Sequence, residues 1–290
     1  MNQKDTTEKM LADYNDVFAD VSNVLLFKGN RLIKECDLQN TKDKSQYKAD
    51  GKIHEQERDL SKIWKQCNIK LAMIGMENQT DVDSYMPLRV IGYDGAVYRS
   101  QYPQKKDDKT NIYPVITMIL YFGRKKWDKA TCLSDIMKIP EELKPFFQDY
   151  HINVFNISYL TDEQVSMFQS DFRIVANHFV QMRRNPEHYI PDTTKIKHVD
   201  AVLKLMKVLT GDERYEEVAN EYLEKGGELN MCEILDRYEN RGIAKGRAEG
   251  LKALVQSLRT FCPDLDTLYK IVIKNETYSS VTKDELKKYL

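Results

Sequence analysis

The stretch ERDLSKIWKQCNIKLAMIGMENQ, residues 57–79, decides the fold that this sequence predicts. Two runs of strand-forming residues flank the pair Cys67–Asn68, which fits a two-residue turn between antiparallel strands. With the turn at this pair, opposed residues have numbers that add up to about 135, so Asp59 lies opposite residue 76 or 77. The stretch therefore predicts a β-hairpin that brings Asp59 close to Glu77.

The polar residues of this hairpin allow two interpretations. Glu77 and Gln79 are two residues apart, so they point to the same face of a strand. Directly opposed residues have Cβ atoms about 5 Å apart, and two carboxylates that close repel each other unless a positive charge lies between them. A divalent cation such as Mg²⁺ supplies that charge and can activate a water for attack on a phosphodiester. Acidic residues are also common on exposed hairpins, so the spacing alone leaves the choice open.

The composition is that of an ordered, soluble protein. The chain has 290 residues, of which 41% are apolar and 31% charged, with a formal net charge of −1. No run approaches the roughly 18 apolar residues of a membrane helix, and the N-terminus lacks the apolar core of a secretory signal. The five cysteines are widely spaced without a CxxC pair, which is typical of reduced thiols and not of a disulfide framework or a zinc site. We therefore expect a cytoplasmic protein with no membrane contact.

The order of expected elements divides the chain into two halves. Thr161, with Gln164 three residues on, forms a capping-box pattern that opens the second half, in which only helical patterns occur. We expect an α/β domain over residues 1–160 and a helical region over residues 161–290. The alternative is that Thr161 begins a helix packed on the sheet. The first half is expected to contain helices at 8–27 and 84–102, a surface loop at 28–52, and strands in the hairpin and at 113–122 and 151–160. The second half is expected to contain, after the helix that Thr161 opens, helices at 195–209, 213–224, 229–259, 264–274 and 282–289.

Several familiar catalytic patterns are missing. The sequence has no GxxxxGK[ST] phosphate loop, no GxSxG and no HExxH. These absences argue against nucleotide hydrolysis by a Walker fold, serine hydrolysis and zinc proteolysis. His178 lies within a helical pattern and is expected to be a packing residue.

A glycine stripe marks the helix expected near residues 241–259. Gly242, Gly246 and Gly250 recur every four residues, and the same segment contains five basic residues and one acidic residue. One interpretation is a helix–helix contact between copies of the chain, which would make a homo-oligomer through the C-terminal helices. The other is a flexible, low-complexity linkage. In either case the basic residues could add sequence-independent contacts to phosphates.

Longer stretches carry a resemblance that the hairpin alone would not. They include YNDVFADVSNVLLFKGN, YKADGKIHEQERDLSKIW, YPVITMILYFG and MCEILDRYENRGIAKGRAEG. Together with the order of helix, hairpin with D…ExQ, helix and buried strand, they resemble the Rpn family of recombination-promoting nucleases, labelled putative transposases. That family belongs to the PD-(D/E)XK nuclease superfamily. The resemblance covers roughly residues 12–250 and implies a restriction-endonuclease-like core, a mixed central sheet flanked by helices, followed by an all-helical C-terminal region.

The resemblance assigns roles to the hairpin residues. Asp59 and Glu77 match the two metal-ligating acids, and Gln79 stands where most of the superfamily has a lysine. A neutral glutamine can orient a water or a phosphate but cannot take up a proton, so more of the water activation falls on the metal.

Other residues are candidates for supporting roles. An acid on the first helix, Asp16 or Asp20, is a candidate for completing the site. Arg89 and Tyr93 share a helix face and are candidates for phosphate contacts, although an exposed polar helix face is the alternative.

The sequence thus predicts a metal-dependent DNA endonuclease with little sequence specificity. Its expected cofactor is Mg²⁺, with Mn²⁺ or Ca²⁺ as alternatives, and its expected partner is DNA. The alternative is a catalytically weak or inactive module that binds DNA or a protein through the helical C-terminal half. Nothing in the residues indicates strand-joining chemistry, so the transposase label is not taken literally.

Overall fold

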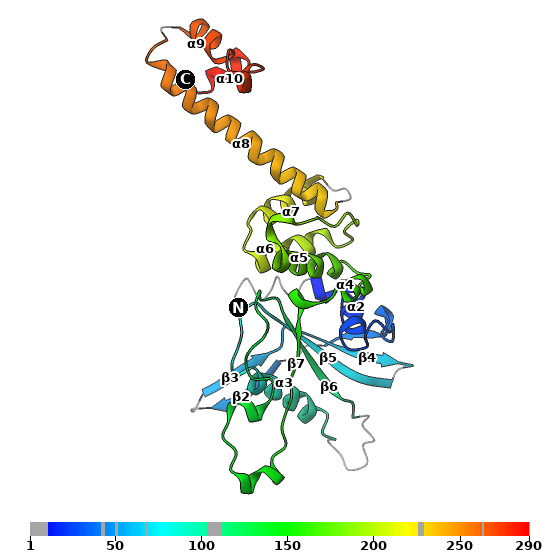
Figure 1. The fold of residues 1–290 in the computed structure, drawn as a ribbon. Coiled ribbons are helices and arrows are strands. Elements are labelled where there is room, and N and C mark those ends of the chain that lie inside the picture. Colours follow the sequence, from blue (N-terminus) through cyan, green and yellow to red (C-terminus); the bar gives the residue numbers. More distant parts are fainter. Residues whose placement is uncertain are drawn as a thin grey trace. The chain divides into compact units, whose positions relative to one another are not determined.

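A computed structural model of the chain describes residues 11–41, 44–49, 52–67, 69–103, 112–225, 229–262 and 264–289 (Figure 1). The chain forms two compact units, Met1–Met231 and Cys232–Leu290. Within the described ranges, no helix combines the length and the apolar character needed to cross a membrane.

The core of the first unit is a mixed sheet of five strands. Its order is β1–β4–β5–β6–β7; β1, β4 and β5 pair antiparallel, whereas β5, β6 and β7 pair parallel. The strands β2 and β3 form a separate antiparallel hairpin. The bounds are β1 Leu38–Asn40, β2 Lys44–Ala49, β3 Lys52–Glu57, β4 Leu60–Gln66, β5 Ile69–Gln79, β6 Val115–Tyr121 and β7 Asn153–Asn156.

The hairpin predicted at residues 57–79 is confirmed as the β4–β5 pair. Cys67 has a positive φ of 47°, as a tight turn requires, and Asn68 lies outside the described residues. An irregularity between Trp64 and Lys65 shifts the register by one residue, so that Leu60 pairs with Met76. Continued by one position, this register places Asp59 opposite Glu77.

The prediction of a surface loop at residues 28–52 is wrong. This region contains the short helix η1 (Glu35–Asp37), strands β1 and β2 and the start of β3. Strand β1 lies at the edge of the sheet, where only Leu38 of its three residues is buried. An edge strand needs only backbone pairing on one side, so a short polar segment can form one without any apolar alternation.

Two helices cover opposite faces of the sheet. Lys62 and Ile74 pair across β4 and β5, and the Lys62 ammonium donates to the Asn15 side chain, at the start of α2 (Asn15–Leu25), over 2.8 Å. A Cβ atom at Gly75 would lie on the other face of the sheet. On that face the Arg58 side chain passes over Gly75 and pairs with Asp94 of α3 (Met86–Ser100). Both helices confirm the sequence prediction over their described residues.

The first unit continues beyond the last strand. The strands end at Asn156, close to the expected boundary at residue 160, but the unit extends to Met231. The ring of Phe122, just after β6, packs against Phe172 and Phe179 of α5, which fixes this helix to the end of the sheet. The strand expected at 151–160 is short, because η4 (Ile157–Tyr159) follows β7 directly.

After β7, the described residues of this unit form the α-helices α4 to α7 and the short helices η4 and η5 (Pro186–His188). The Thr161 capping box is confirmed: the Thr161 hydroxyl accepts from the Gln164 N–H over 3.1 Å, and the Gln164 side chain accepts from the Thr161 N–H over 2.9 Å. The segment that follows is two helices and not one, because the chain turns between Met167 and Phe172. The helices are α4 Asp162–Met167, α5 Phe172–Arg184, α6 Val199–Thr210 and α7 Arg214–Lys225.

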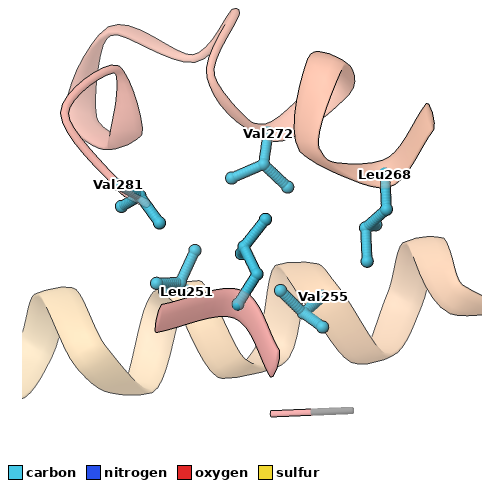
Figure 2. Close-up of a cluster of buried hydrophobic side chains, with 6 residues drawn as sticks. Leu251, Val255, Leu268, Val272 and Val281 are labelled. Atoms are coloured by element: carbon cyan, nitrogen blue, oxygen red, sulfur yellow. The ribbon is translucent and has the colours of Figure 1, made fainter. Parts of the chain in front are cut away.

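The second unit has a small core of its own. It is built from α8 (Met231–Arg259), which starts at the last residue of the first unit, α9 (Leu265–Val272) and α10 (Lys283–Lys287). A Cβ atom at Gly242 or Gly246 would meet no described atom within 4 Å, so this part of the glycine stripe makes no close contact there. The core side chains are Leu251, Val255, Leu268, Val272, Val281 and Leu286 (Figure 2).

Candidate functional site

Asp59, directly before β4, and Glu77, near the end of β5, lie next to each other. The Asp59 carboxylate accepts the backbone N–H of Asn78 over 3.0 Å, which holds it against β5 beside Glu77. Asp59 is half-buried, whereas Glu77 is only 1% exposed. The sheet thus brings one accessible and one deeply buried carboxyl group together.

Glu77 is an unusual buried carboxyl group. Its Oε1 atom is buried and has no hydrogen-bond partner among the described residues. Its Oε2 atom lies 3.6 Å from a guanidinium nitrogen of Arg89. Burial, together with the charge of Asp59, raises the pKa of Glu77 to about 8, and the opposing effects of Arg89 and Arg58 are smaller. Without a cation, Glu77 therefore holds a proton at neutral pH, because burial and, to a smaller extent, the neighbouring charge of Asp59 both disfavour its ionised form.

Arg89 of α3 lies at the rim of the site, and Tyr93 of the same helix lies beneath it. Arg89 also pairs with Asp83 over 3.3 Å and donates to the Tyr93 hydroxyl over 3.3 Å. The Arg89 side chain is 39% exposed, whereas Tyr93 is buried. Arg89 is thus open to a ligand from solvent, and Tyr93 positions it from below.

Gln79 is the last residue of β5 and lies on the same face as Glu77. Its backbone carbonyl accepts the N–H of Phe122 over 2.8 Å, which ties the ends of β5 and β6 together. The three predicted residues therefore lie on one face of the sheet, where β4 begins and β5 ends; they are Asp59, Glu77 and Gln79.

A buried ion pair supports this site and was missed by the sequence reasoning. Arg58, directly before Asp59, pairs with Asp94 over 2.6 Å, and both side chains are almost fully buried. Asp94 also accepts from the hydroxyls of Thr117, over 2.6 Å, and Tyr150. A Cβ atom at residue 75 would collide with the Arg58 side chain, so any residue other than glycine would force this buried side chain to move. A glycine inside an apolar strand was the one available signal of such a close approach.

The structure does not bring Asp16 or Asp20 to this site. Both belong to α2, which lies on the opposite face of the sheet. Asp20 is buried, pairs with Arg31 and accepts the backbone N–H groups of Gln169 and Ser170 over 2.9 and 2.7 Å. These partners show a structural tie between α2 and the α4–α5 turn.

Asp16 makes a similar tie further along the chain. It pairs with Lys197 over 2.6 Å and with the His198 ring over 3.1 Å. The helix position of these acids was predicted, but the face that they occupy depends on how α2 packs.

The chain was compared with known protein families. A family described as "Putative transposase, YhgA-like" matches residues 26–214. The chain belongs to this family. The matched region contains β4, β5, α3 and β6, and it ends at the first residue of α7. It confirms the relationship that the sequence motifs predicted. No curated protein and no solved structure matches the chain.

Proposed function

We propose that this protein is a metal-dependent DNA endonuclease with little sequence preference. The observation that carries the proposal is the Glu77 carboxyl group, which is buried beside Asp59 with one oxygen that lacks a hydrogen-bond partner. A folded protein rarely keeps such an arrangement without a ligand, because an unsatisfied buried carboxyl group costs free energy. Membership of the family described as "Putative transposase, YhgA-like" supports a role in DNA chemistry.

The order of elements supports a PD-(D/E)XK core. Helix α2 precedes the antiparallel β4–β5 hairpin, α3 follows it, and β6 then returns parallel to β5. This is the order of helix, acidic hairpin, helix and buried strand on which the resemblance to the nuclease superfamily rests. The acids also stand at the expected places, one before β4 and one near the end of β5.

The residues present suit a divalent cation. Asp59 and Glu77 offer carboxylate oxygens, the ligands that Mg²⁺ prefers, and Mn²⁺ accepts the same set. A cation would replace the proton that Glu77 otherwise keeps, and it would relieve the repulsion between the two carboxylates. When bound, such an ion polarises a phosphodiester and lowers the pKa of a coordinated water.

The remaining residues have separate tasks in this proposal. Gln79 can hold a water or a phosphate oxygen by hydrogen bonds, but its amide cannot accept a proton. Arg89, half-exposed on the rim, can donate to a phosphate of the DNA backbone. Tyr93 acts through Arg89, because its hydroxyl accepts an Arg89 N–H and its ring is buried.

Cleavage of supercoiled plasmid tests the proposal. The purified protein is incubated with Mg²⁺, Mn²⁺, Ca²⁺ or EDTA, beside the variants Asp59→Ala and Glu77→Ala. We expect metal-dependent nicking by the wild-type protein and none by either variant. Glu141→Gln is the control, since this glutamate is 82% exposed on the β6–β7 connection. Cleavage by both site variants at the wild-type rate, or no cleavage with any cation, would contradict the proposal.

A further inference from the structure

A second group of metal-binding side chains lies at the base of the connection between β6 and β7. Ligand atoms of Cys132, Asp149 and His151 all lie within 4.8 Å of one another. Cys132 is buried, and the other two are exposed. The cysteine spacing gave no indication of this group, because a carboxylate and an imidazole supply the other two donors.

Backbone pairing brings these residues together. Cys132 and His151 form an isolated antiparallel bridge. It is framed by hydrogen bonds from Leu133 N–H to the Tyr150 carbonyl, 3.1 Å, and from Ile152 N–H to the Thr131 carbonyl, 2.9 Å. This pattern marks a non-hydrogen-bonded pair, the type in which facing side chains lie closest. The cysteine thiol and the imidazole are therefore held against each other by the backbone.

Ser134 orients the third donor. Its backbone N–H and its hydroxyl donate to the two oxygens of Asp149 over 3.0 and 2.5 Å. The same hydroxyl lies 3.1 Å from the Cys132 sulfur. These bonds, with the Ser134 hydroxyl as the main cause, hold the pKa of Asp149 below its ordinary value. Hydrogen bonds of this kind around ligating groups are typical of metal sites.

We propose that Cys132, Asp149 and His151 bind a zinc ion. A thiol and an imidazole are the donors that Zn²⁺ prefers, whereas Mg²⁺ selects oxygen ligands only. Zn²⁺ takes four ligands in such sites, so a water completes the three from the protein. Binding converts the thiol to a thiolate and releases its proton to solvent. This site is separate from the proposed nuclease site and does not depend on that proposal.

The ion would join the two ends of a long segment in the connection between β6 and β7. The segment between Cys132 and Asp149 contains two short helices, η2 (Leu133–Ile136) and η3 (Glu141–Phe146), and is the green excursion that reaches away from the strands in Figure 1. Within residues 133–148 only Leu133 is buried, so little packing holds the segment. A metal that joins its two ends would restrict the loop much as a cross-link does.

Cobalt binding to the full-length, reduced protein tests the site. We expect Co²⁺ to give a near-ultraviolet thiolate-to-metal band that Zn²⁺ abolishes by displacement. Cys132→Ser should remove the band, whereas Cys36→Ser and Cys67→Ser, which alter exposed cysteines elsewhere, should keep it. Ser134→Ala should weaken the affinity for Co²⁺ by about 10- to 100-fold, as loss of a ligand-orienting bond typically does. Glu77→Gln should leave the band unchanged, which separates this site from the nuclease site.

Limited chymotrypsin digestion gives a second readout. Phe146, which is 81% exposed, is a ready cleavage point in the clamped segment. Zn²⁺ should slow cleavage there in the wild-type protein and not in Cys132→Ser. The proposal is overturned if the wild-type protein gives no thiolate band, or if Cys132→Ser gives the same band and the same protection.

Discussion

Replacing Glu77 with glutamine should stabilise the metal-free protein, although it should abolish activity. In the unfolded chain a glutamate loses its proton near pH 4.5, whereas in the folded protein the pKa of Glu77 is about 8. A folded pKa above the unfolded value means that the folded state binds the extra proton between these limits. The contribution of this proton to the free energy of unfolding is therefore fully present below pH 4.5 and is lost as the pH rises towards 8. Glutamine keeps the shape of the side chain and has no proton to lose.

The size of the effect follows from the two pKa values. Each pH unit between the two pKa values costs about 1.4 kcal/mol of folding free energy. At pH 7 the wild-type protein has crossed about 2.5 such units, so Glu77→Gln should gain about 3 kcal/mol. At pH 5 the gain should shrink to about 1 kcal/mol or less.

Urea unfolding of EDTA-treated protein measures this difference. With a slope of about 3 kcal/mol per molar urea, the midpoint of Glu77→Gln at pH 7 should lie about 1 M above that of the wild-type protein. Asp94→Asn is the matched control, because it makes the same carboxyl-to-amide change in a buried group that is paired with Arg58. It should destabilise the protein by about 3–5 kcal/mol, since it leaves a buried charge without its partner.

Magnesium should remove most of this difference in stability between the wild-type protein and Glu77→Gln. At about 100 times its dissociation constant, a ligand that binds only the folded state adds about 2.7 kcal/mol. The wild-type protein should gain this stabilisation, and Glu77→Gln should not. Two results would refute the account of Glu77 as a buried carboxyl group that destabilises the fold when it is ionised without a cation. One is that Glu77→Gln destabilises the metal-free protein as much as Asp94→Asn does, and the other is that its effect does not change with pH.

Three further substitutions test the surroundings of the site. Asp16→Asn should leave metal-dependent cleavage of plasmid intact in the folded protein, because α2 lies on the other face of the sheet; loss of cleavage with an unchanged urea midpoint would contradict this placement. Gly75→Ala should lower the free energy of unfolding by about 1–3 kcal/mol, and with it the urea midpoint, since the new methyl group would overlap the Arg58 side chain. An unchanged midpoint would show that Arg58 moves freely. Burial lowers the pKa of His178 to about 4, below its unfolded value of 6.5, so the wild-type protein should lose about 2 kcal/mol between pH 7 and pH 5, and His178→Gln should remove that loss in urea titrations at the two pH values.

The sequence predicted the elements that have strong periodicity. The β4–β5 hairpin, the buried strand β6 and the helices after residue 160 follow from local patterns of apolar residues, and the structure confirms them, except that the single helix expected after Thr161 is the two helices α4 and α5. The strands β1 to β3 were missed because they are short and polar, and β1 gains its place through backbone pairing with β4. No local pattern reports such pairing.

The candidate site was predicted only in part, for the same physical reason. The one-residue irregularity at Trp64 and Lys65 sets whether Asp59 lies opposite Glu77, and it has no signature in the sequence. The pairing of Arg58 with Asp94 joins residues far apart along the chain, so spacing could not reveal it. The face on which Asp16 lies depends on the packing of a whole helix.

The most direct test of the central claim is the nicking rate of supercoiled plasmid by wild-type protein and by Glu77→Gln, each with Mg²⁺ and with EDTA. This variant suits the test because it should be at least as stable as the wild-type protein, so a loss of activity cannot be due to unfolding. The account predicts Mg²⁺-dependent nicking by the wild-type protein and no activity above the EDTA level for Glu77→Gln. Equal nicking by the two proteins in Mg²⁺ would contradict it.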